Sequence, residues 1–392
     1  MGGAVFSSVS VRVQRGNDKA FEPVADQETA AGDILELSEK LAWGQEPTAD
    51  GRFLTVHMDQ NSRCNLRCLA CGFSDPRVDA LSPYDMPREL FDSIARQVFP
   101  LTSYLLFSIQ TEPFMTRDFP ERLFSAREHG VPFSEAITNG TLLTDSVIDS
   151  VIDSGITRLT ISIDGGTKEV AERNRPGSRF ENVVASARQF QQRRRWRGLA
   201  VPMLRINHLL SELNIDSFHQ FLALVESLEP EFVEVRVVER MSNAVVQEAT
   251  DPEFWTKVRA ARVVLDRFCE RTGIQRGGYL RPTLDRIEVH DATGRRMTCR
   301  APWTKLAILP NGDALPCISW TREPLGNFHL HTFEEIWNGP AAVAVRREFE
   351  ERSPGVDCVH CAVKKDVPPR EHDDFFYRKL ARNPPRTVND GK

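Results

Sequence analysis

Short apolar runs alternate with helical patterns from about residue 51 onward, and this alternation constrains the fold more than any other feature of the chain. The repeat is roughly 30 residues long, which is typical of βαβ units whose strands lie parallel in one sheet or barrel. Thr144 can cap one of the intervening helices and Gly155 can end it. Six strands are expected, at residues 53–58, 104–109, 132–138, 158–163, 201–209 and 232–238.

The loops that follow these strands contain the most unusual residues of the chain. In a parallel β/α array the functional groups come from such loops, because all strands end at the same edge of the sheet. Three cysteines, Cys64, Cys68 and Cys71, follow the first strand. Polar and glycine-containing segments follow the next three strands, beginning at Gln110, Thr138 and Ser162. We expect these four loops to lie on one rim.

Composition limits the kinds of partner. The chain has 392 residues, 41% of them hydrophobic and 27% charged, which is enough for two or three domains. A formal net charge of -5 and a pI near 6.1 argue against nucleic acid and anionic lipid as partners. No apolar stretch is long enough to span a membrane, and the first residues lack the apolar segment of a signal peptide, so a cytoplasmic location is expected. Clustered cysteines in that compartment indicate metal ligation rather than disulfides.

The pattern changes after residue 245. Residues 246–297 are expected to form a helical connector, and residues 298–364 a small second domain. Within that domain, two apolar runs flank Asn311-Gly312, which favours a β-hairpin, and Thr332 with Glu335 forms a capping box. Residues 1–50 and 365–392 are polar and weakly periodic, and are treated as an N-terminal extension and a C-terminal tail.

The spacing of Cys64, Cys68 and Cys71 leaves a metal site one ligand short. Thiolates are soft ligands that suit zinc or iron-sulfur clusters. Three of them on one loop can hold three irons of a cubane and leave the fourth iron open for a small molecule. The alternative is a zinc site completed by a neighbour such as Asp59 or His57.

The C-x3-C-x2-C motif directly after the first strand resembles that of the radical S-adenosylmethionine (radical SAM) superfamily. The resemblance extends over residues 52–240. Glu112-Pro113 is similar to the "GGEP" segment of that family, although Gln110-Thr111 replaces Gly-Gly and Ala70 stands where many members have an aromatic residue. It implies a partial (β/α)6 TIM-like barrel that binds a [4Fe-4S] cluster through Cys64, Cys68 and Cys71. The SAM-binding positions that it implies are Gln110, Thr111, Glu112, Pro113, Thr138, Asn139, Ser162, Asp164, Asn207 and Leu209.

Four later cysteines form a second pattern, C-x17-C followed by C-x2-C. It resembles the SPASM/twitch extension of radical SAM enzymes and implies one auxiliary [4Fe-4S] cluster in a small β-hairpin/helix domain. Its ligands would be Cys299, Cys317, Cys358 and Cys361. A zinc ribbon is the alternative for these cysteines taken alone.

Several other residues have two interpretations. Cys269 lies on an apolar helical face, so it is either an inert buried thiol or a hydrogen-atom donor to a substrate radical. The basic segment 193–197 is either a solvated helix end or a phosphate contact. Arg236, Glu239 and Arg240 follow the sixth strand and face either the cavity or away from it. His360 is expected to be a loop residue rather than a ligand.

The resemblance implies a function. The first cluster would cleave SAM to methionine and a 5'-deoxyadenosyl radical, which would take a hydrogen atom from the substrate. Delivery of a second electron to the auxiliary cluster makes the reaction a two-electron oxidation, and dehydrogenation of a sugar or cyclitol is the main hypothesis. Cluster reduction would need an electron donor such as flavodoxin or ferredoxin.

Three alternatives remain open at this point. The first is a ribosomal peptide maturase, for which residues 1–50 look too short to form a leader-binding domain. The second is a radical epimerase that uses Cys269, and the third is a zinc-binding scaffold protein without catalytic activity.

Overall fold

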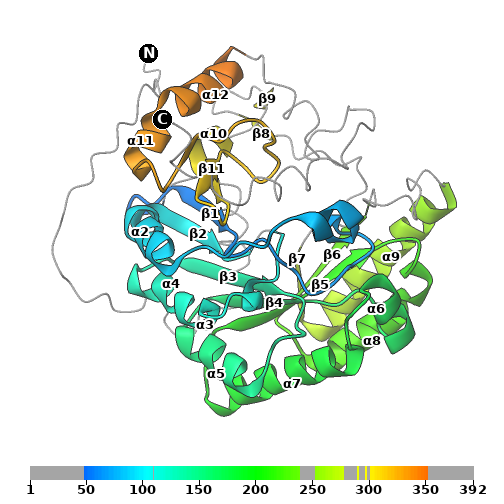
Figure 1. Cartoon of the computed structure of the whole chain (residues 1–392). Coiled ribbons are helices and arrows are strands. Elements are labelled where there is room, and N and C mark those ends of the chain that lie inside the picture. The colour runs from blue at the N-terminus through cyan, green and yellow to red at the C-terminus, as the bar shows by residue number, and fades with distance from the viewer. Residues whose placement is uncertain are drawn as a thin grey trace.

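The computed structural model of the protein describes residues 48–108, 110–238, 252–277, 289–290, 296–297 and 301–351. One mixed sheet organises these residues, with helices along its outer face (Figure 1). Seven consecutive strands run parallel: β1 (Leu54–Met58), β2 (Thr102–Leu106), β3 (Phe133–Thr138), β4 (Arg158–Ser162), β5 (Met203–Leu210), β6 (Phe232–Val237) and β7 (Gln275–Gly277). The six predicted strands and the α/β class are therefore confirmed.

Helices connect the parallel strands and cover them from outside. The longer ones are α2 (Arg88–Val98), α5 (Asp145–Ser154), α6 (Lys168–Asn174), α7 (Phe180–Trp196), α8 (Phe218–Leu228) and α9 (Pro252–Thr272). Short turns complete the connections: η1 (Gly72–Ser74), η2 (Pro76–Ala80), η3 (Phe99–Leu101), η4 (Pro113–Met115), α3 (Phe119–Arg122), α4 (Phe124–Glu128) and η5 (Ile215–Ser217). As expected, the Thr144 side chain caps α5, and Gly155 ends it with a φ of 71°.

The C-terminal part joins the same sheet at its other edge. Strand β10 (Lys305–Ile308) pairs in parallel with β1, and β11 (Asp313–Leu315) and β12 (Gly326–Asn327) follow in antiparallel order. The predicted hairpin is thus present as β10 and β11. The edges of the ten-stranded sheet are β12 and β7, so the barrel is partial.

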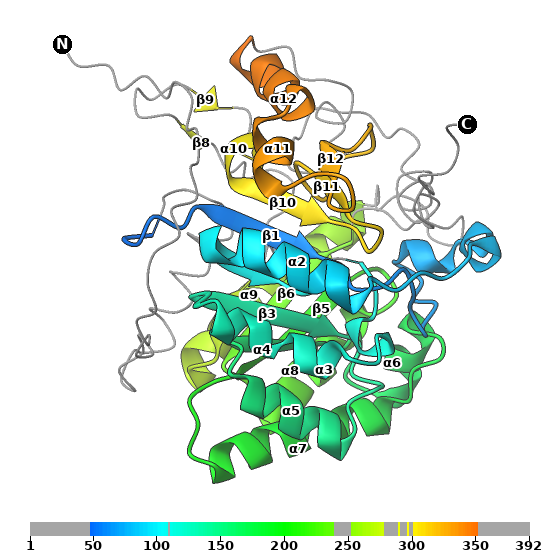
Figure 2. The same ribbon diagram turned by 60° about the vertical axis from the view of Figure 1, so that its left-hand side comes forward.

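Helices α10 (Ala301–Thr304), α11 (Phe333–Asn338) and α12 (Pro340–Glu350) lie beside this hairpin (Figure 2). A small core that includes Leu315, Trp320 and Phe349 supports α10 and α12, whereas Phe333, Ile336 and Trp337 of α11 pack in the main core. The predicted capping box of Thr332 and Glu335 begins α11. A separate two-stranded ribbon consists of β8 (Val289–His290) and β9 (Arg296–Met297).

The structure differs from the prediction in two places. The segment predicted as a helical connector contains β7, a seventh parallel strand that pairs with β6, and also the β8–β9 ribbon. The C-terminal hairpin continues the sheet of the barrel rather than standing apart from it. In the part of the chain that the structure describes, no helix has the length and apolar character needed to cross a membrane.

Strand residues alternate between two environments. Leu159 and Ile161 of β4, like Leu204 and Ile206 of β5, pack in the core beneath the helices. The residues between them face the concave inner side of the sheet, because successive side chains point to opposite faces. That inner side is charged. On it, Arg205 of β5 pairs with Glu135 of β3, so side chains meet across the intervening strand.

Glu135 is the centre of this charged group. Its Oε2 accepts hydrogen bonds from Tyr104 Oη (2.6 Å) and Arg158 Nη2 (2.7 Å), and its Oε1 pairs with Arg205. Burial alone would raise the pKa of Glu135, but the two guanidinium groups outweigh burial and lower it to about 2. Glu135 is therefore an ionised carboxylate in the interior, and its partners are also buried.

Gly166, in the loop after β4, allows that loop to approach α8 closely. A Cβ at this position would lie 2.2 Å from the backbone carbon of Gln220. We expect Gly166→Ala to lower the free energy of unfolding by about 3 kcal/mol, the upper end of the range for overpacking, because rigid backbone must move. Denaturant unfolding measures this loss.

A matched control for this substitution is Ala223→Leu on α8, the helix that Gly166 approaches. This change extends an exposed side chain into an open groove. It should change the unfolding free energy by less than about 0.5 kcal/mol. Equal losses in the two variants would contradict the close-approach argument.

Candidate functional site

The three cysteines that follow β1 lie on a loop that is tied to the end of α6 and the residues just after it. Arg67 N donates to Pro176 O (3.3 Å), and Leu69 N donates to Asn174 O (3.0 Å). In both overall views this blue segment reaches across the strand ends toward α6 (Figures 1 and 2). Because its neighbours come from other strand ends, the cysteine loop lies on the expected rim.

The thiols of this loop suit a cationic metal centre. Burial raises the pKa of Cys64 to about 12 and that of Cys68 to about 11, and it also raises the pKa of Cys71. Without a metal these thiols stay protonated. Metal ions and clusters bind the thiolate, so their positive charge would release the protons on binding.

A single zinc ion fits this loop poorly. Among the described residues, no three histidine, cysteine, aspartate or glutamate side chains are arranged to hold one metal ion. Asp59, a suggested fourth ligand, instead holds the next loop: its Oδ1 accepts from Gln110 N (3.2 Å) and Thr111 Oγ1 (3.0 Å). Thiolates that bind different irons of a cluster do not need to converge on one ion. The donor set therefore fits a cluster better than zinc.

Glu112 joins three loops of the rim. Its backbone N donates to Arg63 O (2.9 Å) beside the cysteines. Its carboxylate accepts from Thr138 Oγ1 and from Asn139 N, both at 2.7 Å. Burial raises the pKa of Glu112 to about 7, although these hydrogen bonds oppose the shift. Glu112 thus has the contacts of a loop anchor, and Pro113 beside it begins η4.

Asn139 and Arg175 connect the rim to the cysteine sulfurs. Asn139 Nδ2 lies 3.8 Å from Cys64 Sγ, and Arg175 Nη1 lies 3.9 Å from Cys68 Sγ. Asp164 holds Arg175 in place, because its Oδ2 accepts from Arg175 Nε at 2.7 Å. Arg175 was not predicted from the sequence. No local pattern distinguishes this partly buried arginine from the many exposed ones.

The fifth strand contributes Asn207 and Leu209 to the same rim. Leu209 N donates to Asp164 Oδ1 (2.7 Å), and Asn207 pairs in register with Ser162 of β4. Asn207 Oδ1 is buried and has no hydrogen-bond partner among the described residues. A buried acceptor without a donor is unfavourable in the protein alone, so this atom suits a ligand that supplies one.

Some predicted residues are not brought to this site. Cys269 lies near the end of α9 and packs against the outer core, at the edge of the sheet where strands begin rather than end. A role as hydrogen donor does not fit this position, whereas a partly buried structural thiol does. Cys317 follows β11 and packs against the small C-terminal core. Cys299, Cys358, Cys361, Glu239, Arg240 and His360 lie outside the described residues.

The basic segment at the end of α7 lies at the surface except for Arg194, which is buried. Arg193 and Arg197 pair with Asp149, Arg195 pairs with Glu229, and Arg194 pairs with Glu231. These ion pairs occupy the guanidinium groups, so the segment is a salt-bridged helix end rather than the solvated end expected from the sequence, and the pairs argue against a phosphate contact.

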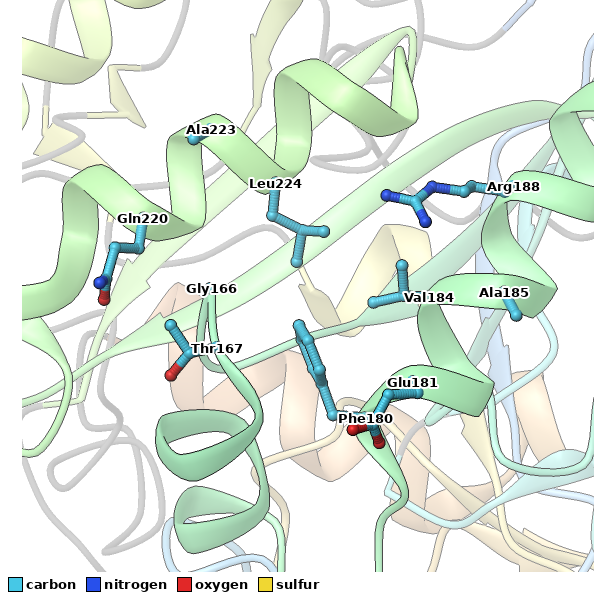
Figure 3. A pocket seen from close by; sticks show the side chains of 10 residues that line it. All are labelled: Gly166, Thr167, Phe180, Glu181, Val184, Ala185, Arg188, Gln220, Ala223 and Leu224. Atoms are coloured by element: carbon cyan, nitrogen blue, oxygen red, sulfur yellow. The ribbon is translucent and has the colours of Figure 1, made fainter.

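A groove of about 480 Å³ opens on the outer surface between α7 and α8 (Figure 3). Phe180, Val184 and Leu224 line it, with Gly166 and Thr167 at one end. No cysteine lines this groove, and it lies on the helix side of the sheet. It is therefore separate from the cysteine loop.

Two family models match the chain. A model described as the radical SAM superfamily matches residues 61–223, and a SPASM model described as an iron-sulfur cluster-binding domain matches residues 299–362. The first match contains the cysteine loop and every rim segment named above. The second contains the four later cysteines.

Individual proteins are also similar to the chain. PqqA peptide cyclase of Rhizobium meliloti is 24% identical over 289 residues, which is 70% of this chain and 71% of that protein. SuiB of Streptococcus suis bound to S-adenosylmethionine has a TM-score of 0.59 at 17% identity, covering 80% of this chain and 71% of SuiB. anSMEcpe with bound AdoMet has a TM-score of 0.57 at 18% identity. The match covers 83% of this chain and 96% of anSMEcpe. Further structures contain SuiB with the precursor peptide SuiA and anSMEcpe with the Cp18Cys peptide.

Proposed function

Because the chain belongs to the radical SAM superfamily and has a C-terminal SPASM domain, we propose that it is an enzyme that oxidises or cross-links a peptide. The proposal departs from the main hypothesis from sequence, dehydrogenation of a sugar or cyclitol. A curated relative is a peptide cyclase, and two proteins of similar fold have been solved with peptides bound. These relatives support the peptide maturase that the sequence left as an alternative.

The observation that carries the radical SAM part of the proposal is the contact between the cysteine loop and the other rim loops. Cys64, Cys68 and Cys71 would hold the SAM-binding [4Fe-4S] cluster. With SAM bound there, the cofactor pair would supply a 5'-deoxyadenosyl radical able to remove a hydrogen atom from the substrate. The protein's task is to hold SAM in the right place and to keep water away from the radical.

The rim residues have defined parts in this proposal. Asn207 Oδ1, the buried acceptor without a partner, would receive a hydrogen bond from a ribose hydroxyl of SAM. The backbone of residues 110–113 would line the amino acid end of SAM, with Glu112 fixing that backbone through Thr138 and Asn139. Ser162, Asp164 and Leu209 would complete the site.

The auxiliary cluster would be held by Cys299, Cys317, Cys358 and Cys361, within the region that the SPASM model matches. It would accept the second electron when the substrate is oxidised. A flavodoxin or ferredoxin would supply the first electron to the SAM-binding cluster.

The test is an anaerobic reaction of the reconstituted full chain with reductant, SAM and peptides encoded next to its gene. We expect 5'-deoxyadenosine to form in proportion to peptide, and the peptide to lose two hydrogen atoms. Deoxyadenosine that forms equally without peptide, together with an oxidised sugar or cyclitol in a parallel screen, would overturn the proposal in favour of dehydrogenation of small molecules.

Arg175 offers a second prediction that does not depend on the substrate. Its guanidinium, held by Asp164, lies 3.9 Å from Cys68 Sγ and stabilises negative charge on that sulfur. Cluster reduction adds negative charge, so Arg175→Gln should shift the reduction potential of the SAM-binding cluster to a more negative value. A redox titration followed by electron paramagnetic resonance measures the shift.

The matched control for Arg175→Gln is Arg188→Gln. Arg188 lines the outer groove between α7 and α8, and no cysteine lines that groove. It should leave the potential unchanged. An unchanged potential in Arg175→Gln would show that the guanidinium does not act on the cluster.

A further inference from the structure

The inner face of the barrel contains charged residues that neither a cluster nor SAM requires. We call these five residues the lumen cluster: Glu135, Arg158, Arg205, Glu234 and Arg236. They come from four neighbouring strands and form one connected set of ion pairs. Arg158 and Arg205 contact Glu135, and Arg205 and Arg236 contact Glu234.

The lumen cluster has one positive charge in excess. It contains three guanidinium groups but two carboxylates. Burial alone would raise the pKa of Glu234, but the charges of Arg205 and Arg236 outweigh burial and lower this pKa. The guanidinium groups around Glu135 lower the pKa of Glu135 in the same way. Both carboxylates are therefore ionised, and the uncompensated charge favours an anion in the lumen.

Arg236 is the member of the lumen cluster that a ligand can reach. Its side chain is 55% exposed, against 9% for Arg205 and 3% for Arg158. It also lies closest to the end of its strand. Arg236 pairs in register with Leu209, whereas Glu234 pairs with Asn207. Arg236 is thus next to the two β5 residues assigned to SAM, on the following strand.

The guanidinium of Arg236 has donors to spare. Its Nε contacts Glu234 Oε1, which fixes the direction of the side chain. Its two terminal nitrogens have no partner among the described residues. A guanidinium held in this way can give two parallel hydrogen bonds to one carboxylate, a geometry that a neutral amide cannot reproduce.

We propose that Arg236 binds a carboxylate of the substrate, so that the peptide presents an acidic residue, glutamate or aspartate, inside the barrel beside SAM. This inference rests on the proposed function, since it specifies which peptides the site accepts. It makes Arg236 a residue that determines specificity. Glu234 holds the Arg236 guanidinium in position, and Arg205 in turn pairs with Glu234.

The experiment measures binding to the reconstituted, SAM-loaded full chain by calorimetry. One probe pair is the blocked pentapeptide Gly-Gly-Glu-Gly-Gly and its Gln counterpart, and the other is glutarate and glutaramide. The wild type should bind each acid roughly 10- to 100-fold more tightly than its amide, as expected for a charge-assisted bidentate contact. Arg236→Gln should remove this preference, and Arg236→Lys should keep part of it.

The matched control is Arg271→Gln, which removes an exposed arginine paired with Glu226 on the outer helices. It should retain the full preference for acids. Thermal unfolding of each variant shows whether the protein still folds, and SAM affinity is measured in parallel. If Arg236→Gln weakens SAM binding, the guanidinium belongs to the SAM site and the proposal is wrong.

The remaining outcomes distinguish the role of Arg236 from the peptide function. Peptides that bind without any preference for the acid would overturn the Arg236 proposal and leave the peptide function standing. Glutarate that binds through Arg236 while no peptide binds would support the subsite and overturn the peptide function. A preference for acids that persists in Arg236→Gln also overturns the role of Arg236.

Discussion

Replacement of Cys68 by serine is expected to abolish SAM cleavage while the protein stays folded. Cys68 is one of three thiols that fit the SAM-binding cluster, and its sulfur contacts Arg175. Residues that merely support metal ligands cost 10- to 100-fold in activity when removed, so loss of a ligand should cost more than roughly 100-fold. We expect reconstituted Cys68→Ser to contain about four fewer irons per chain than the wild type and to form no 5'-deoxyadenosine above background.

Cys269→Ser is the matched control for this substitution, because it changes a cysteine that packs against the outer core. It should keep both the iron content and the SAM cleavage of the wild type. Loss of product in Cys269→Ser, with iron content and SAM cleavage retained, would restore the hydrogen-donor hypothesis. Full cleavage in Cys68→Ser would remove the basis for assigning the cluster to this loop.

Replacement of Glu135 by glutamine should cost the largest amount of stability of any substitution described here. The carboxylate compensates Arg158 and Arg205, which are both buried. Removal of one partner from a buried ion pair leaves an uncompensated charge and typically costs 3–5 kcal/mol. We expect a loss of about 4 kcal/mol in the unfolding free energy of the cluster-loaded protein, measured by denaturant titration.

The matched control is Glu181→Gln, which breaks the exposed pair between Glu181 and Lys168. It should cost less than about 0.5 kcal/mol. A double variant, Glu135→Gln with Arg158→Met, should lose less than the sum of its single changes, because it removes one of the charges left without a partner. Strictly additive losses would contradict the coupling.

The contribution of Glu135 also has a defined pH dependence. Its pKa is about 2 in the folded protein, against an ordinary value of 4.5. A lowered pKa adds stability above the ordinary value, and that stability is lost as the pH falls through the folded value. The stability gap between wild type and Glu135→Gln should therefore be constant near neutrality and shrink between pH 4.5 and about 2. A gap that widens over this interval would contradict the assignment.

The extent to which the fold followed from sequence depends on how local each signal is. The six long strands and the caps of α5 and α11 were predicted because apolar runs and capping residues are local patterns. Strand β7 was missed because its three residues, Gln275–Gly277, have no apolar run. The parallel pairing of β10 with β1 was missed because residues far apart in sequence choose their partners through the packing of the whole sheet.

The candidate site likewise has some features that were predicted from local sequence and others that depend on the fold. The cysteine spacing and the rim segments were visible in the sequence, and the structure brings them together. Arg175 and the lumen cluster were not predicted as a group, because their ion pairs depend on strand register and on the curvature of the sheet. Asp164 and Glu112 were predicted as site residues, but only their hydrogen bonds reveal that they hold Arg175 and the loop of Asn139.

The central claim is that the loop of Cys64, Cys68 and Cys71 holds a cluster on which SAM binds. The most direct measurement is electron paramagnetic resonance of the reduced, reconstituted protein with SAM labelled by ¹⁵N at its amino group. We predict hyperfine coupling between the cluster and this nitrogen in the wild type, and no coupling in Cys68→Ser. A wild-type cluster signal that is unaffected by labelled SAM would contradict the claim.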